Sequence, residues 1–187
     1  MSFSFTFDAA TEHVTVEPGS TKIPSRAFYS ESIRSVDIPN SVTEIGDNAF
    51  YDSYLEDLVI PDSVTEIGKS AFYFNNIKKL VIPDSVTKIG YLSFGYNNIN
   101  DLVIGESVTP ISDSAFEETD IKELIIPDSV TTIGAYAFND NNIRKLVIPN
   151  SVTKIGYYSF GYNNIKELII PDSVTTIDAY AFNDNNI

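Results

Sequence analysis

Apolar and polar positions follow a pattern that repeats every 22 residues, without insertion, along almost the whole chain. One copy, starting at Ile82, reads Ile-Pro-Asp-Ser-Val-Thr-Lys-Ile-Gly-Tyr-Leu-Ser-Phe-Gly-Tyr-Asn-Asn-Ile-Asn-Asp-Leu-Val. Six positions are apolar in nearly every copy, and the first of them holds Val16, Ile38, Ile60, Ile82, Ile104, Ile126, Ile148 and Ile170. A unit this short cannot enclose a core by itself, so the copies are predicted to stack as the coils of a solenoid.

Within one coil, two segments alternate between apolar and polar residues and predict two short parallel strands. The first is Leu-Val-Ile-Pro, and the second is Ser-Val-Thr-x-Ile on another face. The glycine that follows, at positions 46, 68, 90, 134 and 156, is predicted to turn the chain. The next Ala-Phe pair predicts a single helical or 3₁₀ turn, and Asn-Asn predicts a corner with left-handed backbone.

The two ends of the chain differ from the repeat. Phe3, Phe5 and Phe7 alternate with polar residues, and an alternating segment follows at 13–16. Residues 1–15 are therefore predicted to form a β-hairpin that caps the first coil, and residues 16–187 to form the solenoid. The last coil carries no comparable cap, which predicts an open end formed by Val174, Ile177 and neighbouring apolar residues.

The string Ile-Pro-x-Ser-Val-x-x-Ile-Gly-x-x-Ala/Ser-Phe resembles the BspA-like class of leucine-rich repeat over about residues 16–187. The resemblance implies a right-handed curved solenoid with short parallel strands on its concave side. It also implies a partner-binding or adhesion protein at the cell surface or outside the cell. Two features depart from that class: the unit has 22 residues rather than 23, and asparagine stands where many members carry cysteine.

Composition limits the classes of partner that the chain is expected to bind. With 26 acidic and 12 basic residues, the chain lacks the basic surface that nucleic acids and anionic membranes require. No segment approaches the roughly 18 apolar residues of a membrane span, and the first residues lack the pattern of a signal peptide. There is no cysteine, which excludes disulfides and thiolate zinc sites.

Residues with catalytic or metal-binding chemistry are few. His13 is the single histidine and falls in the predicted cap, so we expect it to have a structural role. The Asp-Asn-Asn segments at 140–142 and 184–186 lack the spacing of a calcium loop. The divergent copy at 104–125 is rich in carboxylates, which indicates either drift in a solvated coil or a docking spot for a basic partner or a cation. We expect no cofactor and no enzymatic activity.

The predicted concave strand provides the main candidate surface. Its outward positions form a row of aliphatic side chains roughly 25 Å long, which we call the aliphatic ridge. The ridge consists of Val59, Val81, Val103, Ile125, Val147 and Ile169. Beside it runs a column of mostly alternating charge: Asp57, Lys79, Asp101, Glu123, Lys145 and Glu167. An apolar row with a charged border is typical of a surface that binds a protein or a glycan, although β-branched residues also serve sheet formation alone.

Three other interpretations remain open from sequence. The open C-terminal end favours a scaffold that self-associates, for example as a homodimer. The Ser and Thr of Ser-Val-Thr form two hydroxyl columns of the kind found on ice-binding surfaces, unless the serine bonds buried backbone. Tyrosines recur in three columns, where they either cover the Phe column or contact a partner: Tyr29, Tyr51 and Tyr73; Tyr96 and Tyr162; and Tyr136, Tyr158 and Tyr180.

Overall fold

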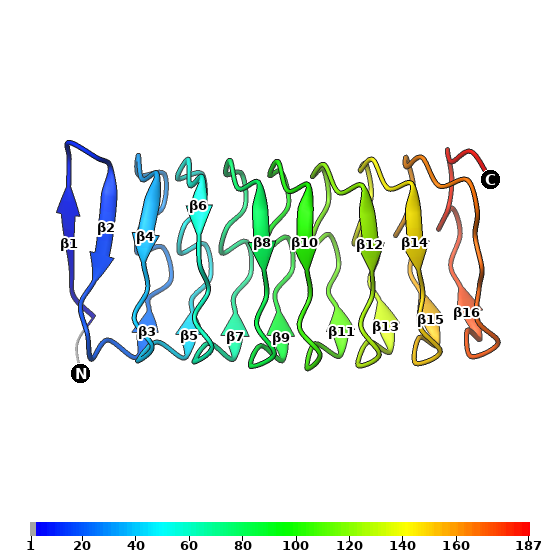
Figure 1. The fold of residues 1–187 in the computed structure, drawn as a ribbon, viewed down its shortest axis with the longest axis horizontal. Coiled ribbons are helices and arrows are strands. Elements are labelled where there is room, and N and C mark those ends of the chain that lie inside the picture. The colour runs from blue at the N-terminus through cyan, green and yellow to red at the C-terminus, as the bar shows by residue number, and fades with distance from the viewer. Residues whose placement is uncertain (1–2) are drawn as a thin grey trace.

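The computed structural model describes residues 3–187 as a mainly β parallel solenoid whose coils follow one another along the long axis (Figure 1). Two rows of short strands run the length of the molecule, one above the other in that view. The upper row contains β2 (His13–Val16), β4 (Ser35–Asp37), β6 (Asp57–Leu58), β8 (Lys79–Val81), β10 (Asp101–Val103), β12 (Glu123–Ile125) and β14 (Lys145–Val147). The surface that this row presents is called the long-strand face below.

The lower row forms the short-strand face and contains strands of two residues each. They are β3 (Lys22–Ile23), β5 (Glu44–Ile45), β7 (Glu66–Ile67), β9 (Lys88–Ile89), β11 (Pro110–Ile111), β13 (Thr132–Ile133), β15 (Lys154–Ile155) and β16 (Thr176–Ile177). Within each sheet the strands of these rows pair in parallel with equivalent residues opposite each other, as Ile45 with Ile67 and Val81 with Val103, while β6 and β8, β9 and β11, and β10 and β12 belong to different sheets. This register places each repeat position directly above the same position of the previous coil.

The core consists of the apolar columns that the repeat pattern predicts. The phenylalanines from Phe50 to Phe160 are fully buried and stack with ring centroids 5.2 to 5.6 Å apart. The isoleucine column from Ile23 to Ile155 is equally inaccessible, with at most 1% exposure. Because each ring is covered by the rings of both neighbouring coils, one continuous core extends through the solenoid.

The predicted helical or 3₁₀ turn at Ala-Phe is not confirmed, because residues 3–187 contain no helix. Each coil instead places two residues in left-handed backbone around this segment, for example Leu92 (φ 56°) and Tyr96 (φ 56°). A left-handed residue every four positions interrupts any right-handed helix. Alternate N–H groups bond to the next coil, as Phe94 N–H does to the Ala115 carbonyl (2.9 Å). The N–H groups of Ser93 and Gly95 bond instead to carbonyls three residues earlier in the same coil. The segment is therefore a series of turns held to the next coil, and not a continuous helix.

The Asn-Asn corner also differs from its prediction. The left-handed residue is the one before the pair, while the first asparagine is buried and bonds to the preceding coil. Asn97 accepts a hydrogen bond from the Ile77 N–H (3.1 Å) and donates to the Phe72 carbonyl (2.9 Å). These bonds satisfy two buried main-chain groups that have no strand partner, which explains why asparagine recurs at this position, although Ser53 and Thr119 occupy it in two coils.

The glycines at this repeat position allow neighbouring coils to approach closely; they do not provide a turn with positive φ. Only Gly19 among the glycines has positive φ. A Cβ atom added at Gly90 would lie 2.5 Å from the carbonyl carbon of Gly68, and one added at Gly156 would lie 2.6 Å from that of Gly134. The missing side chain lets successive coils pack backbone against backbone at this corner.

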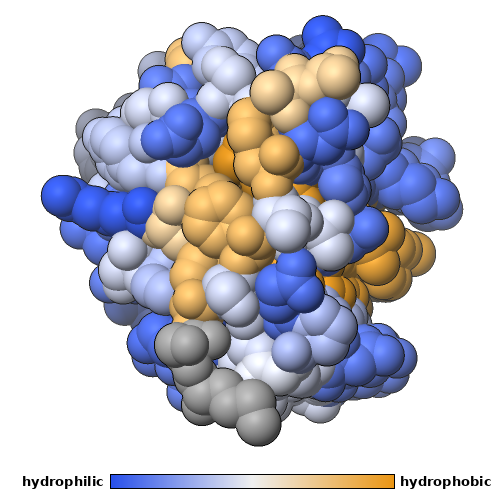
Figure 2. Space-filling view, turned by 90° about the vertical axis from the view of Figure 1, so that its left-hand side faces the viewer, coloured by the Kyte–Doolittle hydropathy of each residue, from blue (hydrophilic) through white to orange (hydrophobic). Residues whose placement is uncertain are grey.

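At the N-terminal end, β1 (Phe5–Asp8) pairs antiparallel with β2, which pairs in parallel with β4. β1 and β2 thus form a hairpin over Phe5–Val16, while Met1 and Ser2 of the predicted cap lie outside the described residues. Phe3 and Phe5 contact the ring of Phe28, but Phe5 remains 44% exposed. Figure 2 shows the result as an apolar centre with a mostly hydrophilic border on this end of the molecule.

Candidate binding surface

The aliphatic ridge lies outside the core, as the alternation of strand residues predicts. In β8, Leu80 points inward and is 1% exposed, while Val81 points outward and is 48% exposed. The exposed fractions of the six ridge residues are 77% for Val59, 48% for Val81, 52% for Val103, 66% for Ile125, 45% for Val147 and 84% for Ile169. None of these side chains is used to fill the interior, so the fold leaves the whole row accessible.

The charged column beside the ridge contains ion pairs between coils. Lys79 Nζ lies 3.3 Å from Asp101 Oδ2, and Lys145 Nζ lies 3.8 Å from Glu123 Oε2. All four side chains are more than half exposed, so each pair stabilises the fold by about 0–1 kcal/mol at most. Asp57 and Glu167 form no ion pair with any residue in 3–187, which leaves both ends of the column unpaired.

Shallow hollows accompany the ridge along the long-strand face. A groove of about 720 Å³ crosses β6, β8 and β10 and contains Val59, Val81 and Val103 at its floor or walls. A second hollow of about 430 Å³ includes Val147 and Ile169, and a third of about 400 Å³ includes Val59 beside β4. Five of the six ridge residues therefore line hollows, and Ile125 lines none of the three.

The charges around these hollows change along the molecule, which the sequence pattern did not indicate. The groove across β6, β8 and β10 is lined by five carboxylates and two lysines, and the carboxylates include Glu56, Asp62 and Asp84. The hollow at β14 is lined by Arg144, Lys145 and Lys166 against one carboxylate, Glu167. The long-strand face is thus acidic around β6–β10 and basic around β14.

His13, the single histidine, for which we expect a structural role, lies between two side chains of β4. Its Nδ1 atom is 2.7 Å from Ser35 Oγ and its Nε2 atom is 3.3 Å from Asp37 Oδ2. The residue types match those of a Ser-His-Asp triad, and the sequence pattern did not bring them together. However, β4 is paired with β2 on one side and β6 on the other, so its N–H groups are used in ladders rather than free to stabilise an oxyanion. The contacts are those of a hydrogen-bonded row that fastens the hairpin to the first coils.

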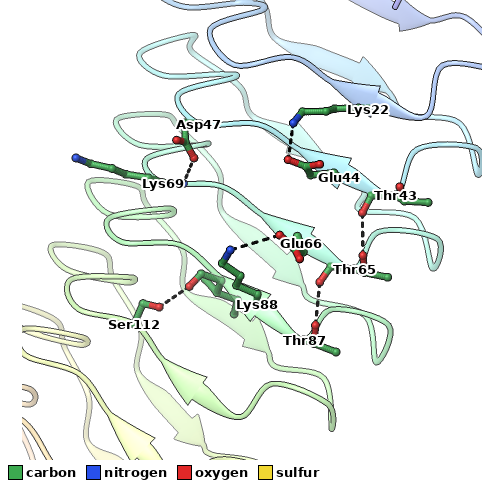
Figure 3. Close-up of polar contacts among 11 residues, drawn as sticks. Lys22, Thr43, Glu44, Asp47, Thr65, Glu66, Lys69, Thr87, Lys88 and Ser112 are labelled. Atoms are coloured by element: carbon green, nitrogen blue, oxygen red, sulfur yellow. Dashed lines mark hydrogen bonds and ion pairs between the residues drawn. The ribbon is translucent and has the colours of Figure 1, made fainter. Parts of the chain in front are cut away.

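The hydroxyl columns are engaged in main-chain bonding, which contradicts the basis of the ice-binding interpretation. Ser85 Oγ donates to the Val64 carbonyl at 2.7 Å, and Ser63, Ser129 and Ser173 make the equivalent bond, whereas Ser151 Oγ is buried without a hydrogen-bond partner. Figure 3 shows the threonine column on the short-strand face, in which Thr65 Oγ1 donates to the Thr43 carbonyl (3.2 Å). Because most of these hydroxyl groups donate to the preceding coil, the columns support the stacking of coils.

The tyrosines form two stacks at the left-handed turns. One contains Tyr29, Tyr51 and Tyr73, with ring centroids 4.8 and 5.1 Å apart. The other contains Tyr136, Tyr158 and Tyr180, at 5.6 and 5.0 Å. Since neighbouring rings cover one another's faces, a partner reaches mainly their hydroxyl edges.

Residues 3–187 contain no group of three or more His, Cys, Asp or Glu side chains placed to hold a metal ion. The carboxylates of the divergent coil at 104–125 are thus not gathered into such a group. Over the same residues there is no helix of the length and apolar character needed to cross a membrane.

Comparison with solved structures identifies similar solenoids in bacterial proteins. A leucine-rich repeat protein from Bacteroides ovatus is 25% identical with a TM-score of 0.79, over 88% of this chain and 44% of that one. A leucine-rich repeat protein from Eubacterium ventriosum is 26% identical with a TM-score of 0.58, over 89% and 55%. The pneumococcal vaccine antigen PcpA shares the fold at 20% identity and a TM-score of 0.50, over 98% and 64%.

The chain spans about half the length of the first two of these structures. A comparison with curated proteins finds no match. The sequence pattern of the BspA type leucine rich repeat region matches residues 21–143 and 131–187 in six copies. These matches cover nearly the whole solenoid, and the chain belongs to the BspA-type leucine-rich repeat family.

Proposed function

We propose that the protein is a non-enzymatic binding module that holds a protein partner, or a glycan, on its long-strand face. The observation that carries this proposal is the exposure of all six residues of the aliphatic ridge along one face of the solenoid. Exposed β-branched residues favour strands, but sheet formation does not require six in an unbroken row with no polar residue among them. The hollows on the same face provide depth for side chains of a partner.

The bacterial surface is the setting that fits this proposal. One structural relative carries the description of a vaccine antigen, which is consistent with exposure to the host. We accordingly propose a role in adhesion at the cell surface or outside the cell.

The test is selection of ligands from a library of random peptides displayed on phage, using the wild-type protein as bait. We expect enriched peptides that lose at least tenfold in affinity for the double variant Val81→Glu/Val103→Glu, because two buried charges without partners oppose an apolar contact. The matched control is Thr87→Glu/Thr109→Glu, which adds the same charges to the same coils on the short-strand face. Peptides that bind both double variants equally, or no enrichment at all, would contradict a binding role for the ridge.

A second candidate function, assembly with another copy, is favoured by the last coil. In this chain Ile170 is 39% exposed, Ile177 is 46% exposed and Ile187 is 63% exposed, although the equivalents of the first two are buried in other coils. We propose that a second copy covers this end and forms a homodimer.

This candidate predicts that the solution mass depends on concentration. Light scattering of the 187-residue chain over a hundredfold concentration range should show growth from 20.7 kDa towards twice that mass. Ile177→Glu should restore the monomer mass at every concentration. A constant monomer mass for the wild-type chain would reject assembly through this end and leave the ridge proposal unaffected.

A further inference from the structure

A hollow of about 280 Å³ lies at the corner where the left-handed turns lead back to the long-strand row. It is separate from the aliphatic ridge and shares no lining residue with it. Its exposed wall is formed by Tyr54 and Phe74, which are 55% and 53% exposed, together with Tyr96. We call it the corner hollow.

One wall of the corner hollow comes from a single repeat position in four successive coils. Asp52, Phe74, Tyr96 and Glu118 occupy that position with φ values of 53°, 58°, 56° and 49°. Left-handed backbone costs little for aspartate but more for bulky side chains. The same position holds Asp140 and Asp184 in later coils, so the turn itself does not require an aromatic residue.

Phe74 therefore lowers the stability of the fold in two ways. It takes an unfavourable backbone conformation, and about half of the residue is exposed to water. Its ring packs at the edge of the tyrosine cluster, with centroids 6.3 Å from Tyr73 and 6.4 Å from Tyr96, and about half of the residue stays exposed beside the hollow. Backbone strain that the fold does not need is a sign of function. An aromatic ring held open to solvent beside a hollow points to a ligand that packs on its face.

The polar groups around the ring define what that ligand must offer. Asp52 and Glu118 supply carboxylate acceptors, and Asn76 and Asn98 supply carboxamides that both donate and accept. Within residues 3–187 the side chains of Asn76 and Asn98 have no hydrogen-bond partner. Their equivalents in later coils do have partners: Asn142 donates to Asp120 (2.7 Å) and Asn164 donates to Asn142 (3.1 Å). No lysine, arginine or histidine lines the hollow.

Neighbouring hydroxyl groups of a sugar match this set, because each hydroxyl donates to a carboxylate while accepting from an amide. The C–H groups on one face of a sugar ring carry partial positive charge and pack on the electron-rich face of an aromatic ring. An ammonium group would satisfy the carboxylates and the ring but would leave the amide donors unused. The volume of the hollow accommodates a small ligand only.

We propose that the corner hollow binds one ring of a neutral saccharide, with Phe74 as the stacking platform and Asp52, Glu118, Asn76 and Asn98 as hydrogen-bonding groups. A ligand of this size is expected to bind weakly, with a dissociation constant of about 1 mM. The proposal does not rest on the function of the ridge, so Val81→Glu/Val103→Glu should leave saccharide binding intact.

The experiment is saturation-transfer NMR with the protein and millimolar methyl glycosides of glucose, galactose, mannose and N-acetylglucosamine, each measured separately. We expect transfer to the ring C–H protons of at least one of these sugars. Phe74→Ser should weaken that binding roughly 2- to 10-fold, the range that loss of one aromatic contact supports. Serine already occupies this repeat position as Ser30, with φ of 56°, so the variant is compatible with the turn.

The matched control is Tyr162→Ser, which removes an exposed aromatic residue from the same repeat position in a coil far from the hollow. It should leave sugar binding unchanged. The proposal is overturned if none of the four sugars shows transfer, or if both serine variants weaken binding equally. It is also overturned if Nα-acetyl-lysine amide shows Phe74-dependent transfer while the sugars do not, since that would make the hollow a cation site.

Discussion

The glycine column sets how closely neighbouring coils approach at one corner of the solenoid. Gly68 and Gly90 lie so close that a Cβ atom on the second would overlap the main chain of the first. Main-chain atoms cannot move aside as a flexible side chain can. The requirement for glycine is therefore one of space between coils, which a single sequence does not distinguish from a requirement for positive φ.

Gly90→Ala should consequently destabilise the fold by about 1–3 kcal/mol, the usual cost of overpacking. The free energy of unfolding is measured by urea denaturation. The control is Gly95→Ala in the same coil, where the added Cβ would meet its nearest atoms at 3.3 to 3.4 Å and other coils already carry side chains. Equal losses in both variants would show that the effect comes from backbone freedom and not from the contact between coils.

At the scale of the structural element, the phenylalanine column is the central support of the coils. Phe94 is fully buried and stacks between Phe72 and Phe116, with centroid distances of 5.3 and 5.6 Å. Phe182, at the same repeat position in the last coil, has a ring neighbour only in Phe160 and is partly exposed. The two residues have the same chemistry and differ in how many sides are covered.

Phe94→Ala should cost about 3–5 kcal/mol, because it removes a buried ring and leaves a cavity between two coils. Phe182→Ala should cost clearly less, since water already reaches that ring. Thermal and urea unfolding followed by circular dichroism provide both values. A loss below about 1 kcal/mol for Phe94→Ala would be incompatible with an interior position for the column.

Along the whole molecule, exact stacking of equivalent residues also stacks charges. Glu44 and Glu66 face each other in register on β5 and β7, and the net charge of the chain is −14. The ion pairs that oppose this repulsion are exposed and individually weak. Self-repulsion is therefore expected to lower stability at low ionic strength.

Sodium chloride should raise the melting temperature as its concentration increases from a few millimolar to about 0.5 M, where screening acts within a few ångströms. Chloride is preferred over sulfate because sulfate also strengthens apolar burial. Glu66→Gln should reduce the dependence on salt. A melting temperature that falls with salt would mean that the ion pairs between coils outweigh the repulsion.

Much of this architecture can be predicted from sequence because the register is copied from coil to coil. Once one coil is assigned, the inward columns of Phe, Ile and Val and the outward ridge follow from alternation, and the structure confirms their burial and exposure. The turn between Gly90 and Asn97 could not be predicted in the same way. Its left-handed residues include Leu92 and Tyr96, which have no propensity for that conformation, so contacts between coils override local preference.

The two candidate sites also differ in how well the sequence predicts them. The ridge depends only on which residues point outward from a strand, and that is a property of alternation. The corner hollow depends on where left-handed residues direct Phe74 and Tyr54, and on the absence of partners for two asparagines. One sequence signal could have indicated it: Phe74 stands in a column that otherwise holds polar residues or tyrosine.

The hydrogen bonds that Ser, Thr and Asn side chains make to the preceding coil also favour folding in the order in which the chain is synthesised. Asn97 bonds to main-chain groups 20 and 25 residues earlier, and Ser85 bonds to a carbonyl 21 residues earlier. Each coil therefore brings the groups that attach it to the coil already made. A chain leaving the ribosome can add coils one at a time onto a completed template, and a duplicated stretch of 22 codons arrives with its own means of attachment.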